Sequence, residues 1–354
     1  MKADVSVSGP WQGFAPPTFL GTAQLRNVRA EMHGLNTPIE IGSATVSLTP
    51  DAVLLHKISA RTGSTHWGGG VTVPRHCVAP NCVFQFDLTA DQLSTEDLAE
   101  WFTPQSTKRP WYRILSAAPQ GASPLLAFQA HGSLHVGRFG VKKVAATQVA
   151  TQLDVDRGKI TLTALRGQLL QGIHQGNWVM DVSGHDVSTR DSSMKSVRYR
   201  GNGILQNISL AQVGSVMNDA WISGTADGKF DLDGSGESFR DLLAHADAKL
   251  QFTMRNGSLP HVEIPGSARP LPVHRFTGEL RLKQGTWELS AGRLESRDGI
   301  YRVSGTASPA SGFDFALTRG DDQSWKLTGT LAKPHVVPRT EGSHADADAK
   351  IAKP

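Results

Sequence analysis

Large apolar residues alternate with polar residues along much of this chain. In the segments 83–88, 250–254 and 312–317, every second residue is large and apolar. Successive side chains of a β-strand point to opposite faces of a sheet, so a period of two predicts strands with one apolar face and one polar face. The same pattern predicts strands at 39–48, 53–58, 71–74, 125–136, 149–155, 159–165, 276–282, 287–289 and 325–331.

Turn residues separate these segments, as in Asp156-Arg157-Gly158 and Arg255-Asn256-Gly257. Turns that follow one another so closely predict a meander of about twenty short antiparallel strands. Short helices are expected at 93–102, 109–117, 209–216 and 238–246, where they would cap the sheet. The first of these has Ser94 and Thr95 at its start and ends before Pro104.

The sequence after Gly158 is echoed after Gly285, at an offset of 127 positions (285 minus 158), and a fainter echo begins at Asp51. Repetition on this scale predicts stacked supersecondary units and an elongated sheet. We therefore divide the chain into a β repeat region at 1–90, a helical and Pro-rich insertion at 91–123, a second β repeat region at 124–338 and a disordered tail at 339–354. The matched pairs are Leu162 with Leu289, Ala164 with Ala291, Arg166 with Arg293, Gly172 with Gly299, and Ile173 with Ile300.

Composition narrows the class of protein. Of 354 residues, 39% are hydrophobic and 19% are charged, so the chain should fold in water. The net charge is only +4 and the basic residues are scattered, which argues against nucleic-acid binding. The first residues lack the apolar core of about 7 to 15 residues of a signal peptide, and no segment approaches the ~18 apolar residues of a membrane span. We expect either a cytosolic protein or, as the immediate start of alternation favours, a soluble part without its targeting segment.

No catalytic or metal-binding motif is present, so we expect neither an enzyme nor a cofactor. His131 and His135 lie four residues apart on a predicted strand, roughly 13 Å, which is too far to share one metal ion. Asp227, Asp231 and Asp233 lack the glutamate that completes a calcium loop, so they are expected on a solvated face.

Cys77 and Cys82 flank a Pro-Asn turn between two predicted strands. This position at the neck of a hairpin allows a disulfide, which would imply an oxidising compartment. The alternative, a metal site with His76, lacks a fourth ligand.

The segment 208–259 combines several features in a characteristic order. A short turn with leucine precedes a strand flanked by glycine (224–232) and a Gly-x-Gly turn at Gly234 and Gly236; a short helix, an alternating strand (250–254) and an Asn-Gly turn follow. In this order the segment resembles the C-terminal region of the AsmA family of bacterial envelope proteins. The two-stranded units 158–183 and 285–308, and the segment 88–102, are also similar to that family. Two features depart from it: Asp247-Ala248 stands where relatives commonly have glycine, and the N-terminal membrane anchor is absent.

The resemblance implies a long antiparallel sheet curled into a groove, in a periplasmic protein tethered to the inner membrane. It also implies binding and conduction of phospholipid or another acyl lipid between membranes, together with membrane-associated envelope proteins as partners; we expect a monomer. The residues expected to line the groove are Phe84, Phe86, Leu126, Phe128, Leu153, Val155, Ile160, Leu162, Leu250, Phe252, Met254, Leu280, Leu282, Phe313, Phe315 and Leu317.

Alternation alone leaves three alternatives open. The apolar faces could pack on each other as a closed core. The protein could be an outer-membrane assembly factor or scaffold that binds proteins through its strand edges. A carbohydrate-active enzyme would need two carboxylates at a defined separation, and no such pair stands out.

Overall fold

The computed structural model describes residues 2–8, 18–31, 35–75, 82–102, 129–182, 197–236, 239–265, 270–308, 312–320, 323–330 and 333–339. Within these ranges nineteen strands form a single sheet, and three short helices are attached to it. The helices are α1 (Thr95–Phe102), α4 (Leu210–Val216) and α5 (Phe239–His245). The strands are β1 (Lys2–Ser8), β2 (Thr18–Ala30), β3 (Ile39–Leu48), β4 (Ala52–Thr62), β5 (Thr65–Pro74), β6 (Val83–Ser94), β7 (Gln129–Val141), β8 (Val144–Asp156), β9 (Lys159–Leu169), β10 (Gly172–Asp181), β11 (Arg198–Ser209), β12 (Ser223–Ser235), β13 (Asp247–Leu259), β14 (Leu271–Lys283), β15 (Thr286–Ser296), β16 (Gly299–Ser308), β17 (Gly312–Arg319), β18 (Gln323–Gly329) and β19 (Pro334–Pro338).

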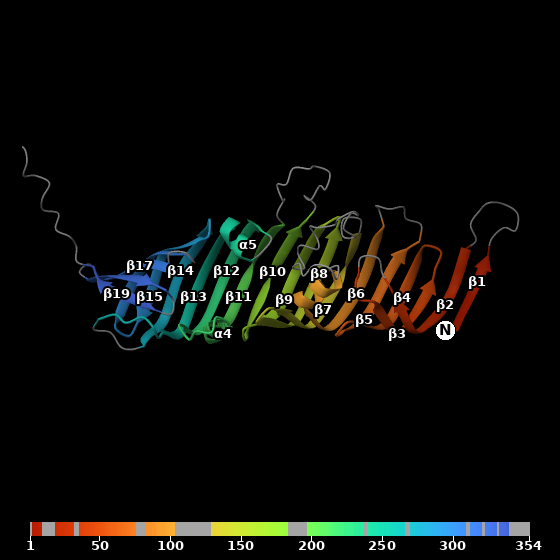
Figure 1. The fold of residues 1–354 in the computed structure, drawn as a ribbon, viewed down its shortest axis with the longest axis horizontal. Helices are drawn as coiled ribbons and strands as arrows, with labels where there is room; N and C mark the ends of the chain where they lie inside the picture. The colour runs from red at the N-terminus through yellow and green to blue at the C-terminus, as the bar shows by residue number, and fades with distance from the viewer. Residues whose placement is uncertain are drawn as a thin grey trace, which may run out of the picture.

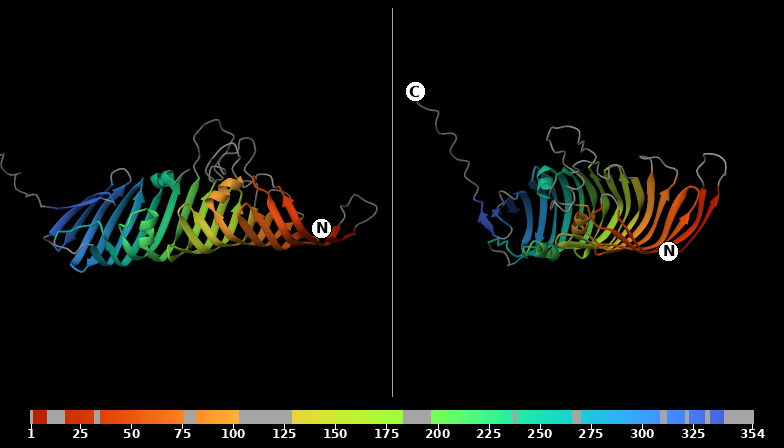
Figure 2. Two further views of the ribbon diagram at one scale, coloured as in Figure 1. Left: turned by 60° about the horizontal axis from the view of Figure 1, so that its bottom comes forward. Right: turned by 45° about the vertical axis from the view of Figure 1, so that its right-hand side comes forward.

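The strands follow one another along the sheet in chain order. Each strand pairs with the next one from β1 to β19, so these two strands lie at opposite ends of an elongated molecule (Figure 1). The strands curve across the width of the sheet, which curls but does not close (Figure 2). The predicted elongated, curled and mainly β architecture is confirmed.

One strand pair differs from the predicted antiparallel meander. β6 and β7 are parallel, with Val83 opposite Gln129 and Ser94 opposite Gly140. A parallel pair needs a connection of a dozen or more residues that brings the chain back to its starting side. The segment between β6 and β7 contains α1 and provides this length.

The helices confirm the predictions at three sites. α1 starts directly after Ser94, whose Oγ accepts a hydrogen bond from the backbone N–H of Asp97 at 3.0 Å, the usual contact of an N-cap serine. α4 and α5 fall within the segments predicted at 209–216 and 238–246. The helix predicted at 109–117 and the tail after residue 339 lie outside the described residues.

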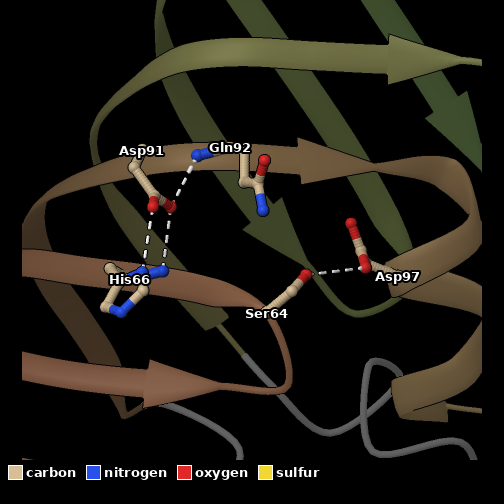
Figure 3. Close-up of polar contacts among 5 residues, drawn as sticks. All are labelled: Ser64, His66, Asp91, Gln92 and Asp97. Carbon is tan, nitrogen blue, oxygen red and sulfur yellow. Dashed lines mark hydrogen bonds and ion pairs between the residues drawn. The ribbon is translucent and has the colours of Figure 1, made fainter.

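Polar contacts join β5, β6 and the start of α1 (Figure 3). Asp91 accepts hydrogen bonds from the backbone N–H of His66 at 2.8 Å and of Gln92 at 2.6 Å, and its second oxygen lies 2.9 Å from Nδ1 of His66. Desolvation raises the pKa of Asp91, but these hydrogen bonds outweigh it and hold the pKa below its usual value. Ser64 contacts Asp97 at 3.4 Å. These contacts tie the first turn of α1 to the edge of the sheet.

Most strands are longer than the alternating segments predicted, and seven of them contain a non-glycine residue in the left-handed conformation. At all of these residues except Asn27 the strand gains one extra position, a β-bulge, and the alternation resumes shifted by one residue. In β15, for example, Leu289 and Gly292 lie on the same face on either side of Ala291, and the register shifts between them. The residues are Asn27, Lys57, Gln148, Ala164, Asn207, Asn256 and Ala291.

The bulges also explain the repeat seen in the sequence. Ala164 of β9 and Ala291 of β15, which match at the offset of 127 (291 minus 164), have φ angles of 54° and 51°. Lys57 of β4, in the fainter echo, has a φ of 51°. Each echo is therefore a strand with a bulge followed by its hairpin partner.

The polar face of the sheet carries cross-strand ion pairs. Arg255 contacts Asp227 at 2.6 Å, so this aspartate belongs to a surface ion pair, as expected of a solvated face. Lys249 and Arg281 both contact Glu279, at 3.0 and 2.8 Å, and hydrogen bonds from Lys249, Arg281 and Gln251 lower the pKa of Glu279 to about 2. Solvent screens such pairs strongly, so they contribute more to register than to stability.

The bulge residues give the first prediction. We expect Ala291→Gly to raise the free energy of unfolding by about 0.5–1 kcal/mol, because relief of the ~1–2 kcal/mol cost of a left-handed alanine exceeds the ~0.4–1 kcal/mol entropy cost of glycine. Urea denaturation followed by circular dichroism measures the change.

Ala145→Gly is the control, since Ala145 lies in β8 outside the left-handed residues. This change should lower stability by about 0.5–1 kcal/mol. Loss of stability in both variants would contradict the assignment of the bulge.

Candidate functional site

The apolar residues of the strands lie on one face of the curled sheet, called here the apolar face. One lateral row crosses this face from β2 to β18, and each member lies directly opposite the next. Every member is apolar or glycine, so no polar side chain interrupts it. We call it the central row, and it consists of Ala23, Val46, Leu55, Val71, Phe86, Gly132, Leu153, Leu162, Trp178, Gly201, Leu232, Ala248, Leu282, Trp287, Ala307, Phe313 and Gly329.

The apolar face is exposed to different degrees along the sheet. Leu55, Val71 and Leu153 in the N-terminal half are only half-buried. Near the C-terminal end, Tyr301 and Trp325 are 0% and 6% exposed and pack together with ring centroids 6.0 Å apart. These N-terminal members of the central row are therefore half-buried, although a smaller core forms beside them around Ala90, Leu93, Trp101 and Val136.

In the C-terminal half the apolar face lines a cavity of about 1250 Å³, whose lining extends from Leu169 of β9 to Pro334 of β19. Small-molecule pockets usually measure about 300–1,000 Å³, so this cavity is large. Asp219, Asp227 and His261 are the charged or titratable residues among those that line it; Asp227 contacts Arg255 at 2.6 Å, and Nε2 of His261 lies 3.7 Å from Asp219. The remainder of the lining is almost entirely apolar, which suits hydrocarbon better than a polar substrate.

One wall of the cavity comes from α4 and from the loops beside it. Leu210 and Val213 of α4, with Met217 just after it, line the cavity, and Met217 is 53% exposed at its rim. The sequence interpretation gave this helix only a capping role. Their spacing of three and four residues, which places them on one side of a helix, was the available signal.

The predicted groove residues fall into three groups. Leu126 and Phe128 lie outside the described residues. Phe84, Phe86, Leu153, Val155, Ile160, Leu162 and Leu282 lie on the apolar face outside the cavity lining. The residues that line the cavity are Leu250, Phe252, Met254, Leu280, Phe313, Phe315 and Leu317.

Several aromatic residues of the apolar face lie opposite glycine on the neighbouring strand. Phe86 faces Gly132. A β-carbon on that glycine would lie 2.7 Å from Cγ of the phenylalanine, so its ring rests directly over the glycine. Such pairing lets a large ring cover the backbone of its neighbour. The other pairs of this kind are Trp178 with Gly201, Phe230 with Gly203, Phe252 with Gly228 and Gly278, Phe313 with Gly329, and Phe315 with Gly305.

His174 is a titratable group on the apolar face. It stacks on Phe230 with ring centroids 5.6 Å apart, and its Nε2 accepts a hydrogen bond from Nε1–H of Trp178 at 3.2 Å. This bond requires an unprotonated Nε2. Burial also lowers the pKa of His174, so the ring is neutral at neutral pH.

No set of three or more metal-ligating side chains that could hold an ion occurs within the described part of the chain. His131 lies 3.3 Å from Asp154, and both side chains are exposed. Cys77 and His76 lie outside the described residues, so the disulfide with Cys82 stays a prediction.

The environment of His174 predicts a pH effect on stability. Because its pKa is lower in the folded protein than the ~6.5 of an unfolded chain, stability should be fully present above about pH 6.5 and decrease as the pH falls through the folded pKa. His174→Phe keeps a stacking ring that cannot titrate. We expect it to weaken the loss of thermal stability between about pH 7.5 and about pH 5.

His335→Phe, on the exposed strand β19, is the matched control and should keep the full loss. An equal loss in wild type and His174→Phe would show that His174 does not contribute.

Comparison with known proteins agrees with the resemblance found in the sequence. The model of the AsmA family matches residues 129–289, which contain β7 to β14 and the first residues of β15. No curated protein and no solved structure matches the chain. The matched stretch includes the pairs of Trp178 and Phe252 with their glycines and much of the cavity lining. Residues 129–289 of this chain are therefore similar to the AsmA family.

Proposed function

We propose that the apolar face binds acyl chains of phospholipid or another lipid and guides them along the sheet, without catalysis. The central row is the observation that carries the proposal, since it offers hydrocarbon a surface free of polar side chains from β2 to β18. Burial of each methylene contributes about 0.8 kcal/mol, so a long chain could bind without specific polar contacts.

The size and lining of the cavity support the same ligand class. At about 1250 Å³ it exceeds the usual pocket, and its titratable residues Asp219, Asp227 and His261 already contact one another or Arg255. A water-soluble polar substrate would lose its hydration there without finding free partners. A flexible apolar chain has no hydration of this kind to lose.

The family gives the cellular setting of the proposal. AsmA proteins belong to the bacterial envelope, and the proposed location is the periplasm, with a tether to the inner membrane. No described helix is long and apolar enough to cross a membrane. In this setting the protein would act as a monomer that carries lipid between membranes, with membrane-associated envelope proteins as partners.

Lipid bound to the purified protein tests the proposal. Native mass spectrometry and lipid extraction should detect acyl lipid with the wild-type protein. Phe252→Glu places a charge in the cavity lining and should reduce the bound lipid about tenfold or more, because an unpaired carboxylate there is costly to bury.

Thr225→Glu is the matched control, since Thr225 is exposed in β12 directly opposite Arg255. This variant should retain wild-type lipid. Wild-type protein without lipid, or equal loss of lipid in both variants, would refute a specific role of the cavity.

A further inference from the structure

Three aromatic rings lie close together on the apolar face beside the cavity. His174 and Trp178 lie on β10 and Phe230 on β12, with ring centroids 5.6 Å (His174 to Phe230) and 5.8 Å (Trp178 to Phe230) apart. The cavity lining reaches them at Leu205, opposite His174, and at Leu250, opposite Phe230. An acyl chain that follows the central row from the N-terminal half towards the cavity therefore passes over the ring of Trp178.

Two glycines of β11 hold the rings low against the sheet. A β-carbon on Gly201 would lie 2.5 Å from Cε3 and from Cζ3 of Trp178, and one on Gly203 would lie 2.9 Å from Cε1 of His174. Such distances are too short for non-bonded carbon atoms. A side chain at position 201 or 203 would therefore push the rings away from the sheet, into the space above the apolar face.

The backbone of β11 does not itself require glycine at position 201. Neither Gly201 nor Gly203 is among the glycines with positive φ, so left-handed freedom is not the reason for these residues. A β-carbon on Gly203 would also meet the carbonyl oxygen of Gln175 at 2.4 Å, whereas the closest atoms to one on Gly201 all belong to the ring of Trp178. A substitution of Gly201 should therefore displace the ring of Trp178 without a clash with the backbone, whereas a substitution of Gly203 would disturb both.

We propose that Gly201 and Gly203 keep the crossing between the two parts of the apolar face open to an acyl chain. The inference rests on the proposed function and adds the residues that control passage. With glycine at 201, the indole of Trp178 forms part of the floor. With a larger residue, the same ring becomes an obstacle between the half-exposed face and the cavity.

Site-specific photo-crosslinking tests passage. The photoreactive amino acid p-benzoylphenylalanine is placed at Phe86, on the half-exposed face, or at Phe252, in the cavity lining. The delipidated protein is then incubated with vesicles of phosphatidylethanolamine and phosphatidylglycerol, and crosslinked lipid is measured over time. In the Gly201→Val background the ratio of lipid at the two sites should shift about tenfold or more from the wild-type ratio, because lipid stays on the side where it enters.

Three further variants make the result specific to the ring. Gly201→Ala should give a smaller shift and covers the case in which valine impairs folding. Gly201→Val combined with Trp178→Ala should return the ratio to the wild-type value, since the displaced ring is gone. Gly42→Val is the matched control, because a β-carbon there has its nearest neighbour at 3.5 Å, an ordinary contact, and the ratio should not change.

The outcomes separate the inference from the proposed function. Lipid at both sites of the wild-type protein, with an unchanged ratio in folded Gly201→Val and Gly201→Ala, overturns the inference and leaves lipid binding intact. Absence of lipid at both sites of the wild-type protein overturns the proposed function and the inference together.

Discussion

Lateral register is the constraint on which the rest of this structure depends. In a single sheet, every strand must keep its apolar residues on the same face as those of its neighbours, and a slip of one residue would turn them to the opposite face. The central row meets this requirement from β2 to β18. Bulges are part of the solution, because the apolar positions of a strand such as β13 change from Met254 to Gly257 where Asn256 adds its extra residue. The apolar pattern of the sequence therefore shifts by one residue at the same position as the backbone register.

The same register produces two environments from one face. Near the C-terminal end the curled sheet brings Leu294, Tyr301 and Trp325 into a packed core. In the N-terminal half Leu55, Val71 and Leu153 of the central row stay half-buried, and a smaller core forms around Trp101 and Val136. The cavity lies directly against this packed region, since Leu294 is also among the residues that line it, and α4 supplies an additional wall. Aromatic rings that pointed straight away from the sheet would occupy the space above the apolar face. Glycine on the neighbouring strand lets the rings of Phe86 and Trp178 lie over the backbone instead.

The sequence was sufficient to predict the class of fold but not the length of its strands. Alternation stops being regular at each bulge, so the predicted strands 53–58 and 159–165 end just after Lys57 and Ala164, whereas β4 and β9 continue beyond them. A bulge of this kind is hard to recognise, because lysine and alanine carry no preference for the left-handed conformation. The parallel pairing of β6 with β7 was missed for another reason, since alternation is the same in parallel and antiparallel strands.

The candidate site was predicted in part. Residues such as Phe252 and Phe315 could be assigned to the apolar face, because the period of two decides the face without any knowledge of the neighbouring strand. Which of them line a cavity depends on how strongly the sheet curls and on where α4 packs, and both are properties of contacts between distant residues. The pairing of Trp178 with Gly201 is of the same kind, because a glycine looks like a weak point of a strand until its neighbour is known.

The AsmA-family match ends within the sheet, but the physical pattern does not. At residue 129 the central row passes from Phe86 to Gly132, and near residue 289 it passes from Trp287 to Ala307, in both places through directly opposed residues. Sequence similarity is lost faster than register, since many apolar residues satisfy one position of a row. A surface for acyl chains would therefore be a property of the whole sheet, including the strands outside the matched stretch. The glycines opposite its aromatic rings tolerate substitution less well. At Gly201, for example, a single added β-carbon would displace the ring of Trp178 from its place against the sheet.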